Sequence, residues 1–276
     1  YTISWKDTEE FHKSNNNLNV KGGRKLGKKI LTNLSKWNKY ENNHDNLNYE
    51  TTFLSAYLKF GCISIREAFH SIKNKFGIND PILRQLFWRE FYYHLGYEFP
   101  QVIGNSLKPD YDKIKWSQKK DTLNAWKNGD TGFPIVDACI RQLNETGYMH
   151  NRGRLITASF LIKNLLHDWR HGEKYFATKL VDYDPLVNNG NWQWVAGSGA
   201  DSQPYFRIFN PWTQGKKFDK DCEYIKKWIP ELKNVPNNEI HEWDKHYKKY
   251  NCYKGPIIDY KKSRIKTLEI YKKALS

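Results

Sequence analysis

Apolar residues recur every three or four positions through most of this chain, and this spacing constrains the fold more than any other feature. Between Asn151 and Trp169 the apolar set Leu155, Ala158, Ile162 and Leu165 follows the helical period and predicts one continuous helix. No convincing run of alternating apolar and polar residues, the mark of a half-buried strand, interrupts the helical pattern. We therefore predict an all-α fold built from many helices.

Start and stop signals support the same prediction. Ser64 to Glu67 has the pattern of a capping box, Asp80-Pro81 combines an N-cap with proline at the first helical position, and Gly147 suits a helix C-terminus. We expect one helix to start at Ser64, a second to run from Pro81 to about Leu95, and a third from Pro134 to about Glu145. A further helix, which carries Ile225 and Trp228, should end before Pro230, and the tail should be helical again after Lys261.

Two stretches of the sequence lack this helical pattern. Residues 1–23 are polar and broken by asparagines and Gly22-Gly23, so we expect a linker or arm there, followed by a helical domain over 24–276. From about Asp182 to Trp212, glycines and prolines alternate with large aromatic residues. This predicts a long irregular, aromatic-rich segment, and such segments are more often functional than idle.

Composition narrows the functional classes. The formal charge of +15 favours a polyanionic partner, nucleic acid before an anionic membrane surface, although much of it comes from lysine in an Asn- and Lys-heavy chain. Four isolated cysteines predict free thiols without a disulfide framework or metal site, and no apolar run has the length of a membrane span. We expect an intracellular protein, in the cytoplasm or the nucleus. Eleven tryptophans exceed what packing alone tends to recruit.

The segment Thr51, Thr52, Phe53, Leu54 and Ser55 precedes an apolar helical stretch. Small hydroxyl residues at such a place are most simply N-caps. The same geometry also presents free N–H groups and a positive dipole end to an anion such as a pyrophosphate. Taken alone, the segment favours the cap.

The helix after Pro81 places Gln85, Trp88, Arg89 and Tyr92 on one face, by their three- and four-residue spacing. An indole, an amide and a guanidinium on one stripe suit a flat polar ligand with an anionic group. An amphipathic surface stripe explains the spacing equally well.

Arg154 falls on the same side of its helix as Ala158, which directs it inward. A buried guanidinium needs a carboxylate partner, because an unpaired buried charge is very costly. Asp182 and Asp184 are the candidates.

Six runs give a specific resemblance: TTFLSAYLKFGCIS, LFWREFYYH, TGFPIVDACIRQL, GYMHNRGRLITASFL, VNNGNWQW and PYFRIFNPWTQGKKFD. In this order, from about Lys21 to past Trp228, they resemble the FAD-binding domain of the photolyase/cryptochrome family. Within that family they look most like the class I enzymes that repair cyclobutane pyrimidine dimers.

The resemblance implies an all-helical domain that holds FAD, and light-driven DNA repair by electron transfer from the excited reduced flavin. The residues that would contact the cofactor are Tyr40, Thr51, Thr52, Phe53, Leu54, Ser55, Gln85, Arg89, Arg154, Asp182, Asp184 and Asn188. Among them Asn188 would face the flavin N5, and Arg154 would lie over the flavin, paired with Asp182.

The resemblance also implies a route for electrons and a lesion site. Trp192, Trp169 and Trp116 match the family's tryptophan chain, with Trp169 and Trp116 progressively farther from the flavin. Trp88 and Trp194 would sandwich a dimer flipped out of damaged DNA while Asn151 bonds its carbonyls. Arg89, Arg152 and Arg207 match basic residues that hold phosphates. Trp37, Trp126, Trp228 and Trp243 are better explained by core packing.

The sequence departs from the family pattern at a few positions. Gln85 stands where dimer-repair enzymes usually carry Glu, and Gln there is commoner in (6-4) photolyases and animal cryptochromes. The histidine pair of the (6-4) enzymes is replaced by Asn151 and Leu155, and Asn164 replaces a common Asp, which would alter the buried charge near the flavin.

Alternatives to dimer repair are a cryptochrome-like blue-light photoreceptor, (6-4) repair, and a basic DNA-binding module that has lost its cofactor. The family's α/β antenna domain has no counterpart here, so 1–23 would be the arm left from it. We expect FAD absorption only, and a monomer.

Overall fold

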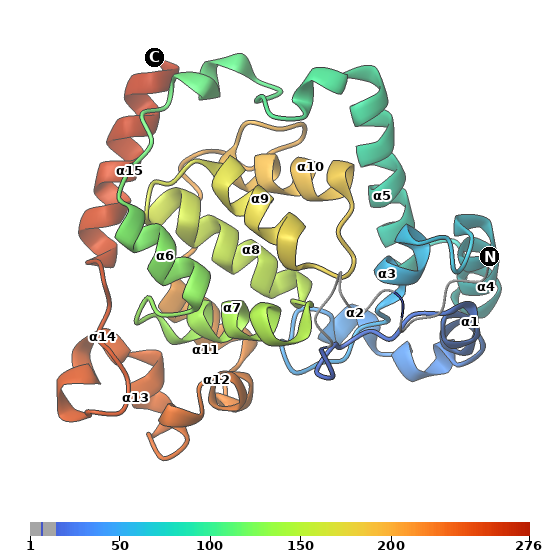
Figure 1. Cartoon of the computed structure of the whole chain (residues 1–276), viewed down its shortest axis with the longest axis horizontal. Coiled ribbons are helices and arrows are strands. Elements are labelled where there is room, and N and C mark those ends of the chain that lie inside the picture. Colours follow the sequence, from blue (N-terminus) through green and yellow to red (C-terminus); the bar gives the residue numbers. More distant parts are fainter. Residues whose placement is uncertain (1–6, 8–14) are drawn as a thin grey trace.

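A computed structural model describes residue 7 and residues 15–276, and this part of the chain is mostly helical (Figure 1). Within this part of the chain no strand occurs, which confirms the all-α prediction. No described helix is long and apolar enough to cross a lipid bilayer. The expected arm over 1–23 lies mostly outside the described residues. Its end, from Asn15 to Asn19, contacts Glu145 and Thr146 through hydrogen bonds.

The N-terminal helices are α1 (Arg24–Thr32), α2 (Tyr40–Asn43), α3 (Leu54–Lys59), α4 (Ile65–Phe76) and α5 (Pro81–Glu98). The central helices are α6 (Lys120–Asn128), α7 (Pro134–Thr146), α8 (Asn151–Ser159), α9 (Trp169–Lys179) and α10 (Pro185–Ala196). The last group is α11 (Pro211–Phe218), α12 (Glu223–Trp228), α13 (Asn237–His241), α14 (Trp243–His246) and α15 (Tyr260–Leu275). Figure 1 shows α7 to α10 in the centre, with α5 on one side and α15 on the other.

The expected caps form as the sequence predicts. Ser64 accepts a hydrogen bond from the N–H of Glu67 at the start of α4, and Asp80 accepts one from Ile82 at the start of α5. Gly147 ends α7 with a φ of 67°, a left-handed conformation that glycine adopts without steric cost. These local signals fix where the helices begin and end.

The continuous helix predicted from Asn151 to Trp169 is wrong. α8 ends at Ser159, a π-helical turn continues to Asn164, and the chain then breaks at Leu166, which has a φ of 57°. Trp169 starts α9 under a cap from Asp168. The apolar spacing persists across the break because both pieces bury the same side of the chain in one core.

The irregular segment predicted from Asp182 to Trp212 is also partly wrong. Pro185 to Ala196 forms α10, capped by the Asp184 carboxylate, which accepts from the N–H groups of Leu186 and Val187. The irregular parts are the short stretch 182–184 before α10 and the longer stretch from Gly197 to Asn210. Gly190 does not break the helix; it makes room for the Tyr92 ring, which lies 2.2 Å from where a Cβ would stand.

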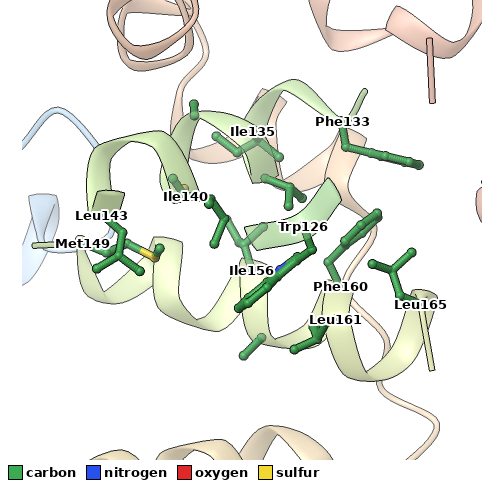
Figure 2. Close-up of a cluster of buried hydrophobic side chains, with 14 of the residues drawn as sticks. Trp126, Phe133, Ile135, Ile140, Leu143, Met149, Ile156, Phe160, Leu161 and Leu165 are labelled. Carbon is green, nitrogen blue, oxygen red and sulfur yellow. The ribbon is translucent and has the colours of Figure 1, made fainter. Parts of the chain in front are cut away.

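Two hydrophobic cores hold the helices together. The larger core fills the space between α6, α7 and α8, where Trp126, Phe133 and Phe160 are almost fully buried (Figure 2). The smaller core joins α3, α4 and α5 through Leu54, Ile72, Leu83 and their neighbours. Trp37, Trp126, Trp228 and Trp243 all belong to these cores or pack against them, as expected.

α9 and α10 approach closely at one glycine. A Cβ on Gly172 would lie 2.1 Å from Cη2 of Trp192 and 2.7 Å from Cδ2 of Leu161. Only a residue without a side chain lets the edge of the buried Trp192 indole come this close to α9.

We predict that Gly172→Ala lowers the free energy of unfolding. Overpacking costs about 1–3 kcal/mol, which exceeds the roughly 0.5–1 kcal/mol that alanine gains over glycine within a helix. Urea unfolding monitored by circular dichroism measures the difference. Gly215→Ala in α11 is the matched control, because its new Cβ would meet its nearest neighbour at an ordinary 3.5 Å. Equal stability of the two variants would contradict this account.

Candidate active site

A cavity of about 560 Å³ lies between the two cores. Its size is that of sites that take cofactors or other small molecules. It gathers most of the residues singled out from the sequence: Tyr40, Thr51, Thr52, Phe53, Leu54, Ser55, Gln85, Trp88, Arg89, Asn151, Arg152, Arg154, Asp182, Asp184, Asn188, Trp192 and Trp194. Segments far apart in the sequence therefore contribute to one hollow.

The start of α3 forms one wall of the cavity. Phe53 occupies the N-cap position with a φ of 53°, and its own side chain makes no cap hydrogen bond there. Thr51 bonds the Tyr148 hydroxyl at 3.2 Å, and Ser55 donates to Asp182 at 2.7 Å. The Thr52 hydroxyl accepts from the Leu54 N–H at 3.4 Å, so one hydroxyl of the segment partly caps the helix, as the segment alone favours. The other N–H groups of the first turn, and its positive dipole end, remain for another acceptor.

Arg154 and Asp182 form the ion pair that the inward arginine requires. The Arg154 guanidinium donates to both Asp182 oxygens, at 3.0 and 2.9 Å, and to the Met149 carbonyl oxygen at 2.9 Å. Burial opposes the charge, but the neighbouring Asp182 carboxylate keeps the pKa of Arg154 above its usual value. The pair places two oriented, mutually neutralising polar groups at the wall of the cavity.

Asp184 and Asn188 lie at the start of α10. Oδ2 of Asp184 accepts from the Tyr93 hydroxyl at 2.5 Å, and Lys59 lies 3.8 Å away. Nδ2 of Asn188 donates to the carbonyl oxygen and to Oε1 of Glu173, both at 3.1 Å. The Asn188 amide nitrogen is thus occupied, and its oxygen Oδ1 is the atom left to serve as an acceptor.

The polar stripe of α5 faces the cavity, as its spacing predicts. Gln85, Trp88, Arg89 and Tyr92 all line the cavity, and Trp88 is 41% exposed. Gln85 donates its amide to the Pro81 carbonyl oxygen at 3.1 Å. Because these four residues line a cavity, they are not just the polar face of an amphipathic surface helix.

The start of α8 places Asn151, Arg152 and Arg154 at the cavity. Arg152 is paired with Asp45, at 2.6 Å, and stacks over Phe218. His150 caps the helix: its Nδ1 accepts from the Arg152 N–H at 3.1 Å. Burial lowers the pKa of His150 to about 4, which matches an imidazole whose Nδ1 must stay unprotonated.

Three predicted residues lie outside the lining of the cavity: Trp116, Trp169 and Arg207. Trp192 lines the cavity, Trp169 is buried at the start of α9, and Trp116 is only half-buried and contacts Tyr271. Asn164 is not among the lining residues; its Nδ2 donates to Ser263 of α15.

Several lining residues were not singled out from the sequence: His44, Asp45, Lys59, Tyr148, Phe176, Asn191 and Asp201. Asn191 and Tyr148 stand inside the runs VNNGNWQW and GYMHNRGRLITASFL, so the runs contained a signal for them. The sequence contains no comparable signal for Asp45, because its partner Arg152 is more than 100 positions away.

Comparisons with known proteins agree with this geometry. The family described as the FAD binding domain of DNA photolyase matches residues 82–273. A deoxyribodipyrimidine photo-lyase of Buchnera aphidicola subsp. Acyrthosiphon pisum is 49% identical over 81% of this chain and 49% of the relative. The chain spans about half the length of the curated relatives it matches.

Two solved structures are similar across nearly all of the chain. A bacterial class III photolyase from Agrobacterium tumefaciens has a TM-score of 0.85 and 40% identity, covering 92% of this chain and 56% of that one. The cryptochrome of Synechocystis sp. PCC6803 has a TM-score of 0.86 and 30% identity, covering 95% of this chain and 59% of that one.

The His150 cap predicts an acid-sensitive fold. Its pKa is about 4 in the folded chain and about 6.5 when unfolded. Between these values the unfolded chain binds more protons, so stability falls as the pH is lowered from 6.5 to 4, by about 1.4 kcal/mol per unit at most. His150→Asn keeps a good N-cap without the titration. The stability difference between wild type and variant, from urea unfolding, should therefore shrink or reverse on acidification; a difference independent of pH would contradict this role.

Proposed function

The chain belongs to the photolyase/cryptochrome family, and we propose that it binds FAD in the central cavity and, in the whole protein, uses light to split cyclobutane pyrimidine dimers in DNA. One observation carries the proposal: a single cavity holds both a set of groups suited to a flat anionic cofactor and a set suited to a flipped pyrimidine pair. The class I assignment and the monomeric state remain predictions.

The residues present fit FAD. The first turn of α3 and the Lys59 ammonium offer donors and positive charge to a diphosphate. The Arg154–Asp182 pair and the Asn188 amide offer fixed polar groups to a ring system, while Trp192 supplies an aromatic wall. Bound FAD would supply the light-absorbing group and the electron that opens a dimer.

The tryptophans give the cavity a connection to the surface. Trp192 lies at the cavity wall and packs against Gly172, one turn along α9 from Trp169. We propose that Trp116, Trp169 and Trp192 pass electrons inward from solvent to the cavity. Their placement from half-buried to buried supports this order.

Trp88, Trp194 and Asn151 would receive the lesion. Two indoles can stack on a fused pyrimidine pair, and the Asn151 amide can bond its carbonyl oxygens. A dimer stacks and pairs poorly in duplex DNA, so its extrusion costs less than that of normal bases. This difference provides selectivity for damage.

Arginines would hold the flanking phosphates. Exposed Arg207 is suited to this role, whereas Arg89 is paired with Glu90 and Arg152 with Asp45, both at 2.6 Å, so these two would add less to affinity. We propose damaged DNA as the partner, and therefore a compartment that contains DNA.

Gln85 supports the same chemistry differently from a carboxylic acid. Its amide can donate a hydrogen bond to a base but cannot supply a proton. We propose that it orients the lesion, and that Gln85→Glu changes the repair rate more than the affinity for DNA.

The first test measures repair directly. The chain loaded with FAD and reduced is illuminated with blue light in the presence of an oligonucleotide that contains one thymine dimer, and recovery of thymine absorbance is followed. Trp88→Ala should weaken dimer binding by about tenfold to a hundredfold, since stacking contributes about 1–3 kcal/mol per base. Tyr97→Ala is the control, because Tyr97 lies on the same helix, 82% exposed and outside the cavity. Retained FAD without repair would favour the cryptochrome-like photoreceptor, and a colourless protein the DNA-binding module.

The second test concerns the tryptophan route. Trp192→Phe and Trp116→Phe should each slow the light-driven reduction of added FAD in the presence of an external reductant, because phenylalanine is much harder to oxidise than indole. Absorbance at the flavin band measures the rate. Trp228→Phe, in a tryptophan assigned to packing, should leave it unchanged. Wild-type rates in both chain variants would refute the assignment.

A further inference from the structure

Lys163 is the most unusual charged residue outside the cavity. It lies in the π-helical turn after α8, its side chain is 1% exposed, and none of the described carboxylates forms an ion pair with it. Its Nζ donates to the carbonyl oxygens of Ala196 at 3.0 Å and Tyr205 at 3.2 Å. It also lies 3.8 Å from the centre of the Tyr271 ring.

The two carbonyl groups belong to the two ends of one loop. Ala196 is the last residue of α10, and Tyr205 lies nine residues later, within the irregular stretch from Gly197 to Asn210. One amine therefore closes this loop at its base. The loop carries Asp201, which lines the cavity, and leads to Phe206 and Arg207, both exposed.

The C-terminal helix α15 supports the same closure. The Tyr271 hydroxyl donates to the Ala196 carbonyl oxygen at 3.2 Å, and its ring stacks on Tyr205 with 5.9 Å between ring centres. The Thr267 hydroxyl donates to the backbone carbonyl oxygen of Lys163. Lys163 and Tyr271 thus hold the same two residues from two different elements.

An amine in this place costs stability. Burial without a carboxylate lowers the pKa of Lys163 to about 7, so both the neutral and the charged amine are populated at neutral pH. A neutral amine still has two N–H donors, enough for both carbonyl oxygens. A methionine would fill the same space at a lower desolvation cost, so the hydrogen bonds, and not the packing, are what lysine adds here.

We propose that Lys163 is a positioning residue for the DNA lesion: by joining Ala196 to Tyr205 it fixes the loop that forms one side of the cavity mouth. The inference rests on the proposed function of that cavity. Trp194 precedes Ala196 by two residues, and Arg207 follows Tyr205 by two residues. Both proposed DNA contacts therefore take their position from the hydrogen bonds of Lys163.

The test compares Lys163→Met with wild type in the free chain, without DNA or FAD. Hydrogen–deuterium exchange of residues 197–207 should rise by about tenfold in the variant, as expected for the loss of hydrogen bonds worth about 1–1.5 kcal/mol. Exchange in α7 and α12 should not change. Lys120→Met, in an exposed lysine on α6, is the matched control. Unchanged exchange in the loop would overturn the proposal.

The second measurement is the preference for damaged DNA. The ratio of Kd values for undamaged and thymine-dimer oligonucleotides should fall by about tenfold in Lys163→Met and stay constant in Lys120→Met. A loosened loop with an unchanged ratio would contradict the positioning role. If the wild-type chain shows no preference for thymine-dimer DNA, the proposed function is refuted. The hydrogen–deuterium exchange result would still test whether Lys163 fixes the loop.

Tyr271→Phe decides the matter if Lys163→Met does not fold. It removes one hydrogen bond to Ala196 and keeps the ring stacked on Tyr205. Increased exchange confined to 197–207 would support the closure, and wild-type exchange there would overturn it.

Discussion

A hollow between two hydrophobic cores can persist only if its polar wall groups hold one another in place, and the Arg154–Asp182 pair does this here. Asp182 accepts from Arg154 and from Ser55, so one carboxylate connects α8, α3 and the segment before α10. Removing either charge would leave the other uncompensated in a partly dry site. The larger and the smaller core are in this way fixed relative to each other.

The cavity combines internally satisfied groups with groups that remain available. Asn188 and Gln85 each bind the protein through the amide nitrogen, which orients the amide and leaves an oxygen as acceptor. At the start of α3 the N-cap residue Phe53 makes no side-chain cap, and apart from the Leu54 N–H, which donates to Thr52, the first-turn N–H groups remain for another acceptor. Such preorganisation lowers the cost of ordering a cofactor or a flipped nucleotide on binding.

Close helix packing makes room for the aromatic residues of the site. Gly172 lets Trp192 lie against α9, and Gly190 lets Tyr92 lie against α10. On the other side of α10, Lys163 and Tyr271 hold the loop that follows it. The position of Trp192 and Trp194 thus depends on contacts from α5, α9 and α15, which are far apart in sequence.

The sequence by itself determined the helical class, the starts of α4, α5 and α7, and the identity of many cavity residues. Caps such as Ser64, Asp80 and Gly147 act within a few residues, so local chemistry reveals them. Tertiary structure alone decided the break at Leu166 and the helical form of Pro185–Ala196, because burial in a shared core overrides the spacing of apolar residues and the effect of a glycine. It also decided that Asp45 neutralises Arg152 and that Lys163 closes the loop after α10. These contacts join residues tens of positions apart, and no local pattern records which side chains the packing of helices will bring together.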